Sequence, residues 1–155
     1  GATLFSFVFR ALGGDDLVVE ILHGLGINTG WEIMIFVMAL VFIMGFFFDW
    51  LEICLIVLPI FAPILSKLSF EPHLATNKDF MLWFTVLIAV NLQTAWLSPP
   101  VAMSAYFLKG VVPQWDLTDI YKGMMQFMGL QLFGLILIIV FPQIALWLPI
   151  YIYGK

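Results

Sequence analysis

Long apolar stretches alternate with short polar ones along the whole chain. Residues 33–48 carry no charged side chain, and with their flanks they reach the roughly 20 residues that a helix needs to cross a bilayer. Residues 53–66, 80–108 and 123–154 are also free of charge, and polar links at 67–79 and 110–122 separate them. This pattern predicts an all-α integral membrane protein with several spans.

The first 25 residues predict two short helices. Residues 2–9 read as the apolar tail of a helix that ends near Arg10, and Gly13-Gly14 forms a turn. Residues 15–25 interleave acidic and apolar positions, so we expect a one-sided helix at the membrane surface. Because the chain starts with Gly1 and an apolar tail, we expect residues 1–155 to be part of a longer polypeptide, without a separate soluble domain.

Proline residues interrupt the apolar stretches. Within residues 53–66, Pro59 removes the N–H that would bond the carbonyl of Leu55, and Pro63 does the same to the carbonyl of Pro59. This segment is also too short for a straight crossing. It is therefore predicted to be either a broken helix or one arm of a re-entrant hairpin, packed against protein or a wet cavity.

The most informative segment joins a polar stripe to a proline pair. Asn91, Thr94 and Ser98 follow i, i+3, i+7 spacing, so a helix places them on one face. Pro99-Pro100 then breaks the helix and frees the carbonyls of Ala95 and Trp96. Hard cations prefer oxygen ligands, so the segment suits a Na⁺ site. Packing offers an alternative, because Ser, Thr and Asn also join membrane helices.

Two carboxylates follow the first long apolar stretch. Asp49 and Glu52 are three residues apart, on one face of a helix. An ionisable group inside a membrane indicates a functional site, which makes Asp49, with Asn91 and Thr94, a candidate for substrate binding or coupling. Alternatively, Asp49 simply meets water at the interface.

Composition and charge narrow the class of protein. Hydrophobic residues make up 63% of the 155 residues, charged residues 10%, and the mean hydropathy is +1.09. A soluble domain of this size cannot bury so much apolar surface. A net charge of −4 with six Lys and Arg disfavours a nucleic-acid partner, and the single cysteine, Cys54, excludes an internal disulfide. His23 and His73 lack companions at metal-ligand spacing, and no catalytic motif is present, so an enzyme is disfavoured.

Several motifs, in this order and spacing, resemble one known family over nearly the whole chain. They are Phe9-Arg10-Ala11-Leu12-Gly13-Gly14, Gly45-Phe46-Phe47-Phe48-Asp49-Trp50, Leu58-Pro59-Ile60-Phe61-Ala62-Pro63-Ile64, Asn91-Leu92-Gln93-Thr94, Ser98-Pro99-Pro100, Tyr106-Phe107-Leu108-Lys109-Gly110-Val111, Phe141-Pro142 and Leu146-Trp147-Leu148-Pro149. The chain resembles the C-terminal half of the large permease subunit of tripartite ATP-independent periplasmic (TRAP) transporters. The run from Gln93 to Lys109, with Asp119-Ile120-Tyr121, is similar to the branch labelled for mannitol or chloroaromatic compounds.

The resemblance implies one half of an inverted-repeat, elevator-type transporter with a re-entrant hairpin and a discontinuous helix. It implies a multi-pass protein of the bacterial inner membrane that imports small organic acids or related solutes with Na⁺ as coupling ion and no other cofactor. Its implied partners are a small four-helix membrane subunit and a periplasmic solute-binding protein. An alternative function is a non-transporting membrane scaffold or interaction subunit.

By the same resemblance, backbone carbonyls supply most of the Na⁺ ligands. Matched by motif, the positions are Gly45, Ala95, Ser98 and Val101. Ala95 is also the residue whose carbonyl Pro99 frees. The family often has Thr where Ser98 stands, and Gly at Ala95 and Ala102.

Overall fold

The fold is described from a computed structural model of residues 1–155, without residues 69, 71–73, 75–76, 100–101 and 154–155 and without the side chains of Ala2 and Asn77. The described residues form helices and contain no strand. In chain order the elements are α1 (Ala2–Ala11), α2 (Gly14–Gly24), α3 (Gly30–Met44), α4 (Trp50–Leu65), α5 (Asn77–Leu92), the 3₁₀ turn η1 (Gln93–Trp96), α6 (Met103–Val111), α7 (Leu117–Val140) and α8 (Gln143–Tyr153). The all-helical architecture predicted from the sequence is confirmed.

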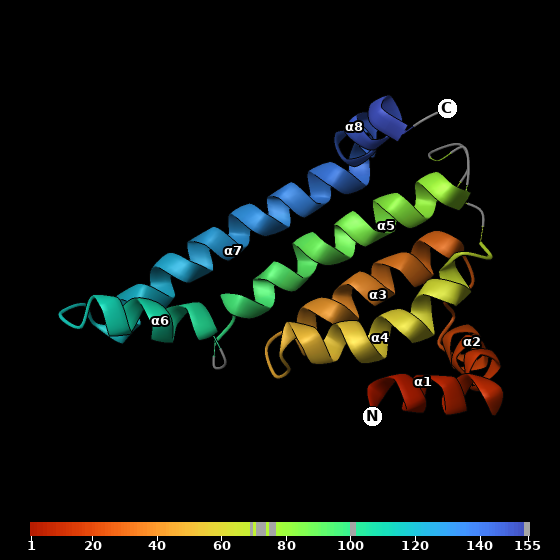
Figure 1. The fold of residues 1–155 in the computed structure, drawn as a ribbon, viewed down its shortest axis with the longest axis horizontal. Helices are drawn as coiled ribbons and strands as arrows, with labels where there is room; N and C mark the ends of the chain where they lie inside the picture. Colours follow the sequence, from red (N-terminus) through yellow and green to blue (C-terminus); the bar gives the residue numbers. More distant parts are fainter. Residues whose placement is uncertain (69, 71–73, 75–76, 100–101, 154–155) are drawn as a thin grey trace.

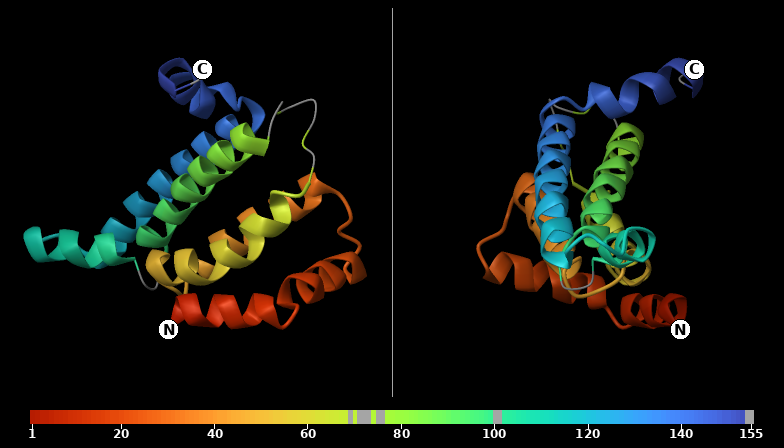
Figure 2. Two further views of the ribbon diagram at one scale, coloured as in Figure 1. Left: turned by 45° about the vertical axis from the view of Figure 1, so that its right-hand side comes forward. Right: turned by 90° about the vertical axis from the view of Figure 1, so that its left-hand side faces the viewer.

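Four helices lie side by side with similar inclination: α3, α4, α5 and α7 (Figure 1). Helix α5 packs between α3 and α7, while α1 and α2 cover α4 on the far side. Helix α8 crosses the bundle at the end where α7 finishes and α5 begins (Figure 2). The opposite end brings together the α3–α4 turn, the end of α5 and the start of α6 (Figure 1).

Large apolar side chains of α3, α4 and α5 form the main core. The largest fully buried ones include Met34, Val37, Ile53, Leu65, Phe80, Trp83, Phe84 and Leu87. Aromatic rings gather where α3 and α5 begin: Trp31 lies edge-on to Trp83 with 6.0 Å between ring centroids. Phe70, from the link before α5, stacks on Phe80 at 4.2 Å. The residues 67–79, predicted as a polar link, therefore also include apolar side chains that fill the core, Phe70 and Leu74.

The α3–α4 pair forms a helical hairpin of short arms. Helix α3 has 15 residues and α4 has 16, so each is about 22–24 Å long, below the roughly 30 Å of a bilayer core. The prediction that residues 33–48, with flanks, reach a full crossing is therefore wrong for α3. The helix ends at Met44 because the chain turns at 45–48, where Phe47 and Phe48 N–H groups bond the carbonyl of Met44 at 2.9 and 2.8 Å.

Pro59 and Pro63 lie inside α4 without breaking it. Their four-residue spacing places both prolines on one side of the helix, and bonds along the other side keep it continuous. The hydroxyl of Ser6 on α1 reaches the carbonyl of Leu55, which Pro59 leaves without its helical donor, at 3.5 Å. Of the two sequence predictions for this segment, a broken helix is wrong, and an arm of a hairpin agrees with the fold.

The break after α5 agrees with the sequence prediction. The α-helix ends at Leu92, tightens into η1, and α6 starts at Met103. Two segments are long and apolar enough to cross a membrane among the described residues, Lys78–Trp96 and Leu117–Val140. Helix α7 ends at Val140, two residues before Pro142, which lacks the N–H needed to continue the helix.

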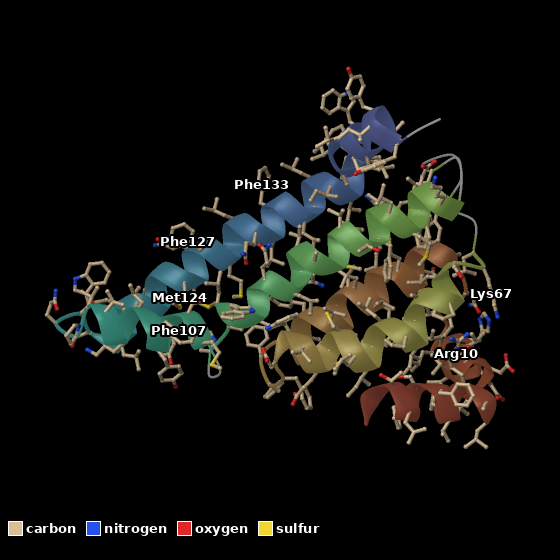
Figure 3. The ribbon with its side chains drawn as sticks, viewed as in Figure 1. Arg10, Lys67, Phe107, Met124, Phe127 and Phe133 are labelled. Carbon is tan, nitrogen blue, oxygen red and sulfur yellow. The ribbon has the colours of Figure 1, made fainter. Side chains whose placement is uncertain are left out.

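Helix α7 carries a broad apolar surface that the other described residues leave exposed. Phe127 and Phe133 project from the side away from α5, with 64% and 61% of their surface exposed (Figure 3). Leu130 and Ile136 are also exposed along this helix. An apolar surface of this size requires lipid or further protein to cover it.

Candidate functional site

The tip of the helical hairpin touches the end of α5. Gly45 follows the last residue of α3, and a Cβ atom on it would lie 3.1 Å from the Cβ and 3.3 Å from the Cα of Ala95. Both residues are buried. A side chain at position 45 would therefore require the neighbouring atoms to shift by a few tenths of an ångström. The structure thus brings together two of the positions predicted for Na⁺ binding.

The polar stripe predicted on one helix face is buried as a unit. Asn91, Thr94 and Ser98 are each at most 1% exposed. The amide Nδ2 of Asn91 donates to the carbonyl of Met38 on α3 at 2.8 Å. The hydroxyl of Thr94 donates to the carbonyl of Asn91 at 2.7 Å, and that of Ser98 donates to the carbonyl of Thr94 at 2.6 Å.

Several prolines leave a backbone carbonyl without its helical donor, and these carbonyls differ in their hydrogen-bond partners. The carbonyl of Ile138, which Pro142 leaves without its helical donor, accepts a 2.8 Å hydrogen bond from the indole Nε1 of Trp83 on α5. The carbonyl of Leu55 accepts from the hydroxyl of Ser6, as described above. Within the described part of the chain, by contrast, no group donates to the carbonyl of Ala95 or Trp96. Among the described residues, these two oxygens therefore have no donor that would compete with a ligand at the break.

Ser98 has a hydroxyl suited to an additional ligand. Its hydrogen points to the carbonyl of Thr94, and its oxygen lies 3.6 Å from the sulfur of Met128 on α7. A hydroxyl that donates one hydrogen bond still offers lone pairs on its oxygen. Hydroxyl and carbonyl oxygens are the ligands that Na⁺ and other hard cations prefer.

Asp49 lies at the hairpin tip as the N-cap of α4. Its Oδ1 accepts the N–H of Trp50 at 2.8 Å, and its side chain is exposed. Glu52 is exposed as well, one turn further along α4. The structure therefore gives Asp49 a capping role and places it next to the turn that contains Gly45. Val101 lies outside the described residues.

A capping box stabilises the start of α3, at the end of the hairpin away from its tip. Thr29 and Glu32 form a reciprocal capping box, in which the carboxylate of Glu32 accepts the N–H of Thr29 at 2.9 Å and of Asn28 at 2.8 Å. Hydrogen bonds from the backbone of Thr29, the backbone of Asn28 and the hydroxyl of Thr29 lower the pKa of Glu32 below its ordinary value. The ring of His23 contacts the side chain of Asn28 at 2.8 Å. Glu32 is thus a capping residue of α3.

The described residues contain no group of three His, Cys, Asp or Glu side chains that could hold a metal ion. His73 lies outside the described residues. Cys54 is half-buried on α4 and carries a free thiol.

A family comparison decides the class of protein. Residues 1–144 match the family model described as "Tripartite ATP-independent periplasmic transporter, DctM component". The chain belongs to the DctM component family of TRAP transporters. This confirms the resemblance found in the sequence, and it makes the chain a component of a membrane transporter.

Two curated relatives support the assignment to the DctM component. The C4-dicarboxylate TRAP transporter large permease protein DctM of Rhodobacter capsulatus is 27% identical over 148 residues, which cover 96% of this chain and 31% of the relative. The sialic acid TRAP transporter permease protein SiaT of Haemophilus influenzae (strain 86-028NP) is 27% identical over 117 residues, 76% of this chain and 17% of the relative. This chain thus spans less than a third of either relative. No solved structure matches it.

Both relatives are permease proteins, which agrees with the expectation of a transporter rather than an enzyme. Neither name refers to mannitol or chloroaromatic compounds, so the branch suggested by residues 93–109 stays a prediction.

Sequence reasoning missed several contacts of this DctM component. The carbonyl of Met38 and the sulfur of Met128 contact the polar stripe, and neither residue is singled out by the sequence. Gln131 of α7 donates to Gln93 at 3.3 Å, across the same break. Pro142 predicts a free carbonyl at Ile138, but no signal in the sequence indicates that Trp83 meets it.

Proposed function

We propose that this DctM component carries one half of the ion and solute sites of a Na⁺-coupled importer. The observation that supports it most directly is the contact of the hairpin tip with the break after α5, where Gly45 meets Ala95. Na⁺ would bind beside the break, at the carbonyl of Ala95 and the hydroxyl of Ser98, with Gly45 and Val101 contributing further carbonyls. The solutes would be small organic acids or related compounds.

The residues at the break would act by offering oxygen atoms that other helices do not occupy. Ion binding would neutralise the carbonyl dipoles and hold the hairpin tip against α5. Asn91 and Thr94, on the face that leads to the break, would couple this event to solute binding. Asp49, at the tip, would face the same aqueous space as the solute.

The short arms of the α3–α4 hairpin support a re-entrant hairpin, since neither arm is long enough to cross. With the discontinuous α5–α6 segment, this arrangement is expected of one repeat of an elevator-type transporter. The chain would lie in the bacterial inner membrane as a multi-pass protein. A small four-helix membrane subunit would cover part of its apolar surface, and a periplasmic solute-binding protein would deliver the solute.

The test is uptake by the complete transporter reconstituted into liposomes. Uptake of the solute is measured with an inward Na⁺ gradient, and again with Na⁺ replaced by K⁺ at equal ionic strength. We expect uptake to require Na⁺. Undiminished uptake in K⁺ would rule out the coupling ion, and the absence of any uptake together with intact assembly would favour the scaffold alternative.

A further inference from the structure

One buried amide links the hairpin to the polar stripe. Asn91 on α5 is 1% exposed, and its Nδ2 donates to the backbone carbonyl of Met38 on α3 at 2.8 Å. Met38 lies seven residues before Gly45, and Asn91 lies seven residues before Ser98. On the α3 side, the hydrogen bond therefore sits about 10 Å, two helical turns, from Gly45. On the α5 side, the chain passes from the end of α5 through η1 to Ser98.

Hydrogen bonds continue from Asn91 to the break without a gap. The carbonyl of Asn91 accepts from the hydroxyl of Thr94, and the carbonyl of Thr94 accepts from the hydroxyl of Ser98. The oxygen of Ser98 then contacts the sulfur of Met128 on α7. The chain of contacts runs from α3, through α5 and η1, to the residue proposed as a Na⁺ ligand.

The other half of the amide is unsatisfied. The Oδ1 atom of Asn91 is buried, and no described residue donates to it. Turning the amide over does not help, because Oδ1 would then face the carbonyl of Met38, and two acceptors repel. A leucine of similar size would fill this position without an unmet polar atom. Packing alone therefore does not account for an asparagine here.

We infer that Asn91 is a positioning residue, which holds α3 against α5 so that Gly45 meets Ala95 and the hydroxyl of Ser98 points correctly for Na⁺. The inference rests on the proposed function, because it assigns Asn91 to the regulation of that same ion site. Asn91 acts through Met38 and Thr94 and does not itself bind the ion. Groups that orient metal ligands in this way change metal affinity by about 10–100-fold when they are lost.

The experiment measures Na⁺ binding without a solute. The complete transporter complex is purified in detergent, and its melting temperature is followed while NaCl replaces KCl at constant ionic strength, since an ion that binds the folded state stabilises it. The proteins compared are the wild type, Asn91→Leu, Ser98→Ala and the double variant. Thr85→Val is the matched control, because its hydroxyl also bonds a helical carbonyl of α5, that of Met81, but on the exposed side.

We expect Asn91→Leu to raise the Na⁺ concentration for half-maximal stabilisation at least about tenfold. The double variant should show no more than the larger of the two single effects, because both residues belong to one chain of contacts. Thr85→Val should leave this concentration, the Na⁺ midpoint, unchanged. If Asn91→Leu does not assemble, Asn91→Ser gives the same test, because serine is too short to reach Met38.

Two results would overturn the inference. In the first, Asn91→Leu lowers the melting temperature in K⁺ but leaves the Na⁺ midpoint unchanged, which is the behaviour of a residue that only packs. In the second, the effects of Asn91→Leu and Ser98→Ala on the Na⁺ midpoint add up in the double variant. If the wild type itself is stabilised equally by Na⁺ and K⁺, the proposed function fails, and this inference fails with it.

Discussion

Gly45 at the hairpin tip and Ala95 at the end of α5 approach so closely that a single added methyl group on Gly45 would lie 3.1 Å from the Cβ of Ala95. The carbonyl of Phe42 would lie 3.2 Å from the same methyl group. Neither neighbour is the end of a flexible side chain, so a larger residue must push the tip away from α5.

The first prediction concerns this contact. Gly45→Val should separate the tip from the break, reduce Na⁺-dependent uptake more than about tenfold, and cost stability on the scale of an overpacked core, about 1–3 kcal/mol. Gly45→Ala should show the same effects more weakly. Gly129→Ala on α7 is the control, because nothing lies within 4 Å of a Cβ there. Normal Na⁺ dependence in Gly45→Val would show that the contact is not part of the ion site.

The second prediction concerns the hydroxyl of Ser98. Ser98→Ala removes an oxygen whose hydrogen is already used by Thr94, and we expect Na⁺ affinity to fall roughly tenfold, equivalent to about 1.4 kcal/mol. Ser98→Thr keeps the hydroxyl and should retain Na⁺ dependence. Affinity is measured from uptake against Na⁺ concentration. An unchanged Na⁺ dependence in Ser98→Ala would mean that this hydroxyl is not a ligand.

The third prediction separates the cap from the charge at Asp49. An asparagine accepts the N–H of Trp50 equally well, so Asp49→Asn should keep the melting temperature, whereas Asp49→Ala should cost about 1 kcal/mol. Uptake is measured for both variants in parallel. We expect Asp49→Asn to transport normally if the cap is its role, and a loss of uptake at unchanged stability would assign the carboxylate to the transport cycle instead.

The fourth prediction concerns the capping box at the start of α3. Thr29→Ala should lower stability by about 1 kcal/mol, and Thr29→Ser should not. Because hydrogen bonds lower the pKa of Glu32, its carboxylate stabilises the fold above the pKa of the unfolded chain, and this stabilisation is lost as the pH falls through the folded pKa. Glu32→Gln should therefore lower the melting temperature at neutral pH, and the difference from wild type should shrink in acid. A difference that stays constant with pH would contradict it.

The fifth prediction concerns the bond between Trp83 and Ile138. Trp83→Phe keeps a buried ring but leaves the carbonyl of Ile138 without a donor, because Pro142 has no N–H. We expect a loss of about 1–3 kcal/mol, measured as a lower melting temperature of the complex. Trp147→Phe on α8 is the control, since Trp147 is exposed. Equal effects of the two substitutions would show that the hydrogen bond contributes nothing beyond ring size.

The predictability of this fold from sequence differs between its prolines. Pro99 follows a helix end, as the sequence predicts, because it lacks the N–H that would continue the helix, but α5 already ends at Leu92 and η1 at Trp96. Pro59 and Pro63 do not break α4, and the hydroxyl of Ser6 on α1 meets the carbonyl of Leu55 that Pro59 leaves without its helical donor. Such compensation depends on contacts distant in sequence, which single-chain periodicity does not contain.

The candidate site, like the fold, could be predicted from the sequence only in part. Spacing alone places Asn91, Thr94 and Ser98 on one face, and all three are buried together. The meeting of Gly45 with Ala95 came from family resemblance, and the residues by themselves did not indicate it. Met38 and Met128 were not predicted, because a backbone carbonyl and a thioether have no polar signature in a sequence.

The break after α5 also separates the large main core from a much smaller one. Beyond it, α6 and the start of α7 bury a small separate core: Ala102, Ala105, Ile120 and Met124. So few side chains supply little free energy, so this end can open locally while the main core stays folded. Opening here would expose Ser98 to water without global unfolding. The stability of this small core would thus determine how often the candidate site becomes accessible.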